Sequence, residues 1–148
     1  MKNRHLKITM MALLGTAAVS AQDMNMNDVP ADLRTTFEQG YPNAADVEWE
    51  KEGESYKVEF EIDRKDHEIW YTADGNTSKT EKQISENDLP QAIQSAISSS
   101  YSEYNIDSVE MTEEGGSATY QVELEKGWND EKQVVFDADG KVLSEMND

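Results

Sequence analysis

The chain of 148 residues has no cysteine, three prolines and only two histidines. Without cysteine no disulfide can form and no lipid can be attached at a lipobox cysteine, so packing alone must hold the fold. His5 lies in the N-terminal segment, which leaves His67 as the one histidine of the remaining chain. Zinc sites use several Cys or His ligands, and this chain does not offer them.

Long hydrophobic runs are also missing. The longest apolar stretch, residues 8–19, is too short to span a bilayer, which takes about 20 apolar residues. It follows a segment with three basic residues and ends in small residues at Ala21. This order is typical of a signal peptide rather than of an N-terminal structural helix. We therefore expect a periplasmic or secreted protein, with no membrane insertion after cleavage.

Basic residues are scarce, since 13 Lys and Arg stand against 31 Asp and Glu. The predicted signal peptide holds three of the basic residues and no acidic one, so its removal leaves a net charge of −21. Binding to phosphates relies on Lys and Arg, and nucleic acid and anionic lipids are therefore not expected partners. A basic partner or divalent cations are compatible with this charge, but a solvated acidic surface is the simpler explanation.

The sequence contains one hydrophobic pattern in two copies. Apolar residues recur at every fourth position over residues 33–41 and again over 93–101, each time after a proline. This spacing predicts two helices with one apolar face each. Further matches follow at growing offsets, among them Val47-x-Trp49 with Val109-x-Met111, as expected for a duplicated unit. The predicted organisation is a signal peptide (1–21), a loose leader without periodicity (22–28) and a single domain (29–148) of two repeats (29–84 and 89–145).

After each predicted helix the period changes to two. Apolar and charged residues alternate over residues 47–50, 56–62 and 120–125, which marks strands with one buried and one wet face. Asp74-Gly75 and Asp139-Gly140 predict two-residue hairpin turns in which both central residues have positive φ. We predict an α+β fold made by tandem duplication of a helix followed by three to four antiparallel strands. One continuous sheet would carry both helices on one face.

Several of these motifs also occur together in a known family. They are Val29-Pro30, Tyr41-Pro42, Val47-x-Trp49, Tyr56-x-Val58-x-Phe60, Tyr71…Asp74-Gly75, Leu89-Pro90 and Phe136…Asp139-Gly140. On these residues the chain resembles the PepSY-like family related to the β-lactamase inhibitory proteins, a group of exported proteins from Gram-negative bacteria. The resemblance implies a tandem helix-plus-antiparallel-sheet fold with a curved sheet. Some relatives hold another protein on that sheet, and PepSY domains are linked to the restraint of proteases.

Catalytic patterns are missing from the sequence. His67 lies in the charged run 64–68, which we interpret as a hairpin turn, and no serine lies in a nucleophile elbow. Close pairs of carboxylates are expected by chance among 31 acidic residues, so they carry no signal for acid–base chemistry. We therefore predict no enzyme and no cofactor.

Two segments are similar to the start of a calcium loop. Residues 137–140 and 74–75 have the Asp and Gly residues of such a loop, but the downstream bidentate Glu is absent at the required spacing. A hairpin turn explains both segments better, and weak Ca²⁺ binding to the acidic surface stays open.

The strand alternation assigns side chains to faces. If Ile69 and Tyr71 point towards the helices, Glu68 and Trp70 point away from them. Trp49 shares a face with Val47 and is assigned to the core. Aromatic residues are enriched at binding hot spots. The candidate partner-binding residues are Trp70, Glu59, Glu61, Glu68, Glu123 and Trp128.

Alternatives exist for both candidate tryptophans. Trp70 would otherwise cover the aliphatic stems of a neighbouring strand, and Trp128 would fold back onto a sheet edge. The leading hypothesis is a non-enzymatic exported binding protein that presents an acidic sheet face to a protein partner, with inhibition of a hydrolase as a narrower form that the resemblance implies. The alternative is a cation- or small-molecule-binding envelope protein that acts as a buffer or sensor.

Overall fold

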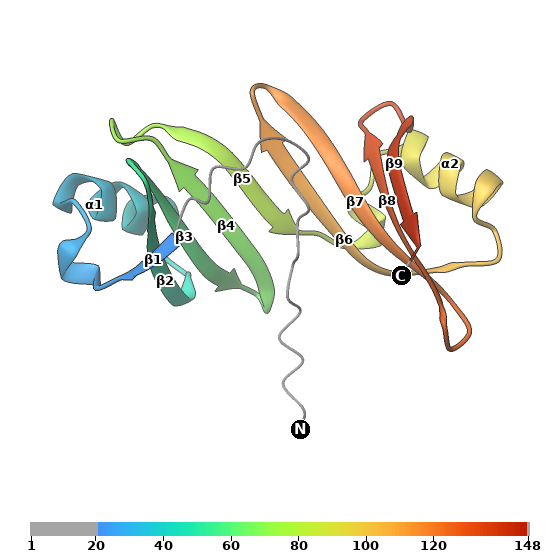
Figure 1. The fold of residues 1–148 in the computed structure, drawn as a ribbon, viewed down its shortest axis with the longest axis horizontal. Coiled ribbons are helices and arrows are strands. Elements are labelled where there is room, and N and C mark those ends of the chain that lie inside the picture. Colours follow the sequence, from blue (N-terminus) through green and yellow to red (C-terminus); the bar gives the residue numbers. More distant parts are fainter. Residues whose placement is uncertain (1–20, 148) are drawn as a thin grey trace.

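The computed structural model describes residues 21–147, and all but the last residue of the predicted signal peptide lies outside this range. The described chain is an α+β fold, with two α-helices and nine strands in one antiparallel sheet (Figure 1). The strands lie side by side in chain order, from β1 to β9. The predicted α+β class with one antiparallel sheet is therefore confirmed. The strands are β1 (Ala21–Met24), β2 (Ala45–Glu52), β3 (Ser55–Ile62), β4 (Lys65–Tyr71), β5 (Thr77–Gln83), β6 (Asn105–Glu114), β7 (Ser117–Lys126), β8 (Asp130–Asp137) and β9 (Val142–Asn147).

Both predicted helices are present. Helix α1 (Ala31–Gly40) and helix α2 (Gln91–Ser100) each begin directly after a proline, a residue that costs little at a helix start because the first N–H groups have no intrahelical partner. A short 3-10 helix precedes each one, η1 (Met26–Asp28) and η2 (Glu86–Asp88). Each α-helix buries the apolar stripe that its sequence spacing predicts. None of the helices within residues 21–147 is long and apolar enough to cross a membrane.

Each α-helix covers its own hydrophobic core. The first core is rich in aromatic rings, among which Phe37 contacts Trp49 and Phe60 at centroid distances of 5.4 and 5.0 Å. The second core is mainly aliphatic. Trp49 is buried in the first core, as predicted. The first core comprises Val29, Leu33, Phe37, Trp49, Val58, Phe60, Ile69 and Tyr71, and the second Leu89, Ile93, Ile97, Tyr101, Val109, Tyr120, Val122, Leu124, Val134 and Phe136.

An additional strand lies where no regular structure was predicted. Residues 22–28 lack periodicity, yet β1 pairs antiparallel with β2, Met24 lying opposite Trp49. Met24 also packs against the first core. Edge pairing needs only backbone groups, so hydropathy periodicity does not reveal it. The prediction of three to four strands per repeat therefore undercounts the sheet.

The Asp-Gly turns differ from the predicted type. Only the glycines have positive φ, 81° at Gly75 and 84° at Gly140. The Gly75 N–H donates to the Thr72 carbonyl at 2.9 Å, and the Thr72 N–H donates to the Asn76 carbonyl at 2.8 Å. This is a longer hairpin loop, in which an ordinary turn is followed by one left-handed glycine. The prediction that both central residues have positive φ was wrong.

His67 also lies elsewhere than predicted. It belongs to β4, and its ring stacks on Phe60 at a centroid distance of 5.2 Å. Burial lowers the pKa of the imidazole, and the nearby Lys82 lowers it further. The turn itself consists of Asp63 and Arg64, two non-glycine residues with φ of 53° and 64°. Because the whole run 64–68 is polar, we predicted a turn for all of it, but the strand already begins at Lys65.

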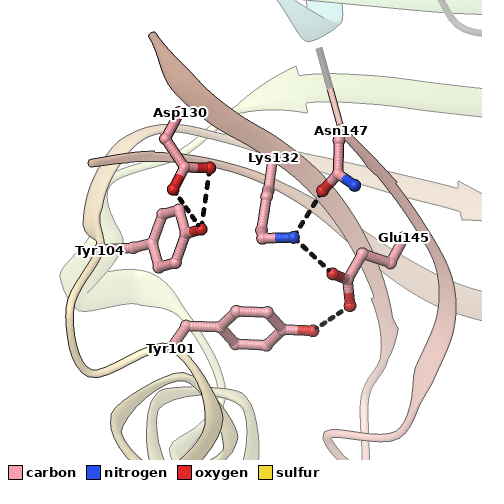
Figure 2. Close-up of polar contacts among 6 residues, drawn as sticks. All are labelled: Tyr101, Tyr104, Asp130, Lys132, Glu145 and Asn147. Carbon is pink, nitrogen blue, oxygen red and sulfur yellow. Dashed lines mark hydrogen bonds and ion pairs between the residues drawn. The ribbon is translucent and has the colours of Figure 1, made fainter. Parts of the chain in front are cut away.

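The last strand is held by a polar network (Figure 2). The Tyr101 hydroxyl, just after α2, donates to Glu145 Oε2 of β9 at 2.7 Å. Lys132 of β8 donates from Nζ to Glu145 Oε1 at 2.9 Å and to Asn147 Oδ1 at 2.5 Å. Beside them the Tyr104 hydroxyl donates to both oxygens of Asp130 at 2.9 Å. These bonds attach the edge strand to the rest of the second half.

Candidate functional site: the polar face of the sheet

On the central strands, polar side chains alternate with the core residues. We call this set the polar face. Its register is continuous from β2 to β7, because each strand is paired with the next. The polar face comprises Glu48, Glu50, Lys57, Glu59, Glu61, Asp66, Glu68, Trp70, Lys79, Glu81, Gln83, Ser108, Glu110, Thr112, Gln121 and Glu123.

One row across the polar face is made of glutamates. Glu48 lies opposite Glu59, Glu59 opposite Glu68, and Glu68 opposite Glu81. Like charges that face each other across strands destabilise a sheet. Glu81 is also buried, with 4% of its surface exposed. This row therefore needs cations close by.

Two lysines of the neighbouring row supply that charge. Lys57 Nζ lies 2.5 Å from Glu59 Oε1 and 2.9 Å from Glu68 Oε2, and Lys79 forms an ion pair with Glu81. Burial alone would lower the pKa of Lys57, but the bonds to both carboxylates outweigh it and raise the pKa above its ordinary value. Burial raises the pKa of Glu68, and Lys57 opposes this effect.

Trp70 lies between these two lysines. The Lys57 and Lys79 ammonium groups are 5.2 and 4.2 Å from the indole ring centroid, distances at which cation–π attraction operates. The indole Nε1–H donates to Glu52 Oε2 at 3.3 Å. Trp70 is half-buried and points away from the core, as the alternation predicted. Lys57 and Lys79 lie directly opposite Trp70 on the two neighbouring strands.

Trp128 occupies a different place. It lies in the loop between β7 and β8 and is 98% exposed. The alternative in which it folds back onto a sheet edge was therefore wrong. Gly127, with a φ of 68°, turns the chain directly before it. An indole so exposed adds nothing to the packing of the fold.

A shallow pocket lies towards the second half of the polar face. It is lined by polar side chains from four neighbouring strands, β4 to β7, and its volume is about 20 Å³, roughly what one water molecule needs. Ser108 already donates to Glu123 Oε2 at 2.8 Å. We call this hollow the acidic pocket; its lining side chains are Asp66, Gln83, Ser108, Glu110, Gln121 and Glu123, together with Val109.

Glu110 is the most buried carboxylate of the acidic pocket. It is 8% exposed, and its carboxylate makes no hydrogen bond or ion pair within the described part of the chain. Burial raises its pKa to about 7, and the charges of Glu81 and Glu68 act in the same direction. Burying a charge without a partner is costly, so the carboxyl holds its proton to a higher pH.

The structure brings together most of the predicted site residues. Glu59, Glu61, Glu68 and Trp70 lie on neighbouring strands of the polar face, opposite or next to one another. Glu123 lines the acidic pocket. Trp128 is separate from them in its loop.

Sequence reasoning missed two central residues. Glu81 and Glu110 are the most buried carboxylates of the polar face. The alternation of Val109, Glu110 and Met111 carried a signal for the second one, since it matches the outward positions of a strand.

The acidic side chains of the described residues are not arranged as metal ligands. No group of three or more His, Cys, Asp or Glu side chains among residues 21–147 could hold a metal ion. In the loop similar to a calcium site, Asp137 Oδ1 accepts backbone N–H bonds from Asp139 and Lys141 at 3.0 and 2.9 Å. The carboxylate thus serves the hairpin turn, as the sequence analysis favoured.

The fold defines the class of protein: a small α+β protein with two helices and a long antiparallel sheet of consecutive strands. The family model described as "Putative beta-lactamase-inhibitor-like, PepSY-like" matches residues 18–66 and 54–144, so the chain belongs to this family. The predicted resemblance is confirmed.

Solved structures share this fold. A BLIP-like protein from Bacteroides fragilis is 28% identical, with a TM-score of 0.59 over 78% of this chain and 83% of that one. A DUF2874 family protein from Bacteroides uniformis is 20% identical, with a TM-score of 0.64 over 80% and 88%. A protein from Bacteroides eggerthii described as "putative periplasmic" is 20% identical, with a TM-score of 0.65 over the same shares. A search of curated proteins gives no match.

Proposed function

We propose that this chain is a non-enzymatic, exported binding protein that holds a protein partner on its polar face. The observation that carries the proposal is Trp70, an indole fixed between Lys57 and Lys79 on the side of the sheet away from the core. Aromatic residues held rigidly at a surface lose little freedom on binding, which makes them effective contacts.

We infer that both helices cover one side of the sheet. The polar face, on the other side, is then available to a partner. The pairing carries one row of residues through both cores, and side chains within one such row share a face. Both helices pack against this row's side of the sheet. The row is Phe60, His67, Lys82, Met111, Tyr120 and Phe136.

Charge points to the chemistry of the partner. The chain without its signal peptide has a net charge of −21, and the polar face is rich in carboxylates. Electrostatic complementarity speeds association with a basic surface and disfavours acidic ones. We therefore expect a partner with a basic segment.

Family and relatives support this function in outline. The relative from Bacteroides fragilis is described as BLIP-like, which fits a sheet that binds protein and, more narrowly, inhibition of a hydrolase. A relative described as "putative periplasmic" fits the predicted signal peptide and a periplasmic or secreted location. The alternative of a buffer for metal cations has less support, because the acidic groups within residues 21–147 do not gather into a metal-binding set.

Affinity capture from envelope extract tests the proposal. The baits are the chain without its signal peptide, its Trp70→Ala and Glu59→Lys variants, and Glu131→Lys as the control. Glu131 is exposed on β8, so the control makes the same charge change away from the first half of the polar face. We expect one protein to be held by wild type and control and lost by both polar-face variants, each of which still unfolds in a cooperative thermal transition. Equal recovery by all four baits contradicts the proposal.

A further inference from the structure

We propose that the acidic pocket receives the ammonium group of a lysine side chain of the partner. This inference rests on the proposed function and adds to it the chemical group that the partner presents. Three carboxylates, two carboxamides and one hydroxyl line the pocket, and no cationic side chain does. The pocket therefore offers hydrogen-bond acceptors in excess and lacks a positive charge.

Glu110 points to a ligand independently of this composition. Its side chain is more than nine-tenths buried, lines the pocket and has no partner among the described residues. Removing a charged group from water without pairing it is unfavourable. A cation that enters the pocket would give this carboxylate the partner it lacks.

Three other carboxylates of the polar face, among them the buried Glu81, have a lysine as partner. Lys57 compensates Glu59 and Glu68, and Lys79 compensates Glu81. In the acidic pocket, Glu110 lies opposite Gln83 on one side and Gln121 on the other, and neither carries a charge. Of the two buried carboxylates of the polar face, Glu81 has an ion pair and Glu110 has none.

Geometry favours an ammonium group over a metal ion. Calcium needs several oxygens at about 2.3–2.6 Å around one point, and the described acidic groups do not converge in this way. An ammonium group accepts longer contacts, about 2.7–2.9 Å, and has three donors on a flexible stem. The pocket's volume of about 20 Å³ admits a group the size of a water molecule.

The pocket is also within reach of a partner that contacts Trp70. Asp66, Glu68 and Trp70 lie at alternate positions of β4, so the pocket begins two such steps from the indole. A partner seated on Trp70 can extend a lysine towards the second half of the sheet.

An NMR titration of the labelled chain without its signal peptide tests the inference. The probe is the peptide acetyl-Gly-Lys-Gly-amide, compared with its Nε-acetyl-lysine and arginine counterparts. We expect shifts of the Glu110, Gln121 and Glu123 amide signals with the lysine peptide, and much smaller ones with the acetylated peptide. Equal responses to the lysine and acetyl-lysine peptides, or no response to either, overturn the proposal. Stronger binding of the arginine peptide also overturns it, because the pocket would then prefer a guanidinium group to an ammonium group.

Variants and pH add a second readout. Glu110→Gln should weaken lysine-peptide binding by about tenfold or more, since it removes the charge while retaining the shape. Glu131→Gln removes one exposed charge elsewhere and should leave binding unchanged. Wild-type affinity should fall by about tenfold from pH 8 to pH 6 as Glu110 takes up its proton. The charged groups that act on Glu110 are Asp66 and Glu68 from β4, Lys79 and Glu81 from β5, and Glu123 from β7.

The outcomes separate this inference from the proposed function. Suppose that the Trp70→Ala variant loses the partner and the Glu110→Gln variant still holds it fully. This result supports the binding function and overturns the proposal of a lysine pocket. If Glu110→Gln does not fold, the wild-type pH series and the acetylated peptide still decide, because they need no variant. Binding that does not change between pH 6 and pH 8 contradicts the role of Glu110.

Discussion

Glu50 in the first half of the sheet and Glu110 in the second occupy corresponding positions and have different environments. Each follows a buried residue that faces the next strand, Trp49 opposite Val58 and Val109 opposite Val122. Burial raises the pKa of both carboxyls, but Glu50 lies opposite Lys57, which lowers it again. Glu110 lies opposite Gln121, and its pKa reaches about 7. The two carboxyls therefore differ both in burial and in the charge of the residue opposite them.

The difference extends to the neighbouring strand. Lys57 lies opposite Trp70, whereas Gln121 lies opposite Val135. The first half therefore has a charged, aromatic surface with ion pairs around Trp70, and the second half has the acidic pocket. The core side of each half shows the same arrangement of a helix on strands. We conclude that the two halves share their packing and differ in what their polar surfaces can bind.

The largest expected effect tests whether the two halves are one folding unit. Phe136→Ala in the second core should cost about 3–5 kcal/mol of unfolding free energy because it leaves a cavity. Phe60→Ala should cost a similar amount in the first core. Urea unfolding followed by tryptophan fluorescence reports the first half, since Trp49 and Trp70 lie there and Trp128 is already exposed in the folded state. Because β5 and β6 are paired, we expect Phe136→Ala to lower this midpoint as well.

A fluorescence midpoint that Phe136→Ala leaves unchanged would contradict the single unit. The matched observable is far-UV circular dichroism, which follows all strands and both helices. Two separate transitions in that signal would show that the halves unfold independently.

The second effect concerns Glu110 and pH. Its folded pKa of about 7 exceeds the ordinary value of 4.5, so the folded state binds the proton more strongly than the unfolded state. Stability contributed by the protonated form is present below the ordinary pKa and is lost as pH rises through about 7. Glu110→Gln should therefore raise the unfolding free energy by roughly 2–3 kcal/mol at pH 8 and by much less at pH 5.

Glu50→Gln is the matched control for this experiment. Lys57 compensates Glu50, so its replacement should bring a smaller gain, or a loss, at pH 8. Thermal unfolding of both variants between pH 5 and pH 8 measures the difference. Equal gains for the two variants would remove the contrast between the halves.

A third, smaller effect concerns the polar network of the second half. Tyr101→Phe removes the hydroxyl that donates to Glu145 and should cost about 1 kcal/mol. Hydrogen exchange of the β9 amides should also become faster, because this strand is at the edge. Tyr41→Phe is the control, since Tyr41 follows α1 as Tyr101 follows α2, and its hydroxyl has no partner among the described residues. A cost for Tyr41→Phe as large as that for Tyr101→Phe would show that the network is not the cause.

The packed side of this molecule could be predicted from sequence, because the necessary signals are local. The spacing of Leu33 and Phe37 indicates a helix face, and the alternation around Val58 indicates a buried strand face. The polar face depends on which residues lie opposite one another, and loop lengths determine that. The sequence pattern matches Trp49 with Met111. In the sheet, however, Trp49 lies opposite Val58 and Val109 lies opposite Val122, so Val109 has the position that corresponds to Trp49.

The candidate site was accordingly predicted in part. The outward direction of Trp70 follows from alternation alone. Its contacts with Lys57 and Lys79 require the register of three strands. The uncompensated Glu110 likewise results from its position opposite Gln121, a neighbour 11 residues away across a hairpin. Sequence periodicity reveals neither the lysine contacts of Trp70 nor the residue that lies opposite Glu110.

The smallest expected effect on stability distinguishes the two candidate tryptophans. Trp128 is 98% exposed, so Trp128→Ser should change the unfolding free energy by no more than about 0.5 kcal/mol. Trp70→Ala should cost more, because it removes contacts with two lysines and the bond to Glu52. If Trp128→Ser weakens capture of the partner at unchanged melting temperature, the binding surface extends beyond the polar face to the β7–β8 loop. Undiminished capture would confine the surface to the polar face, where Trp70 and the acidic pocket lie.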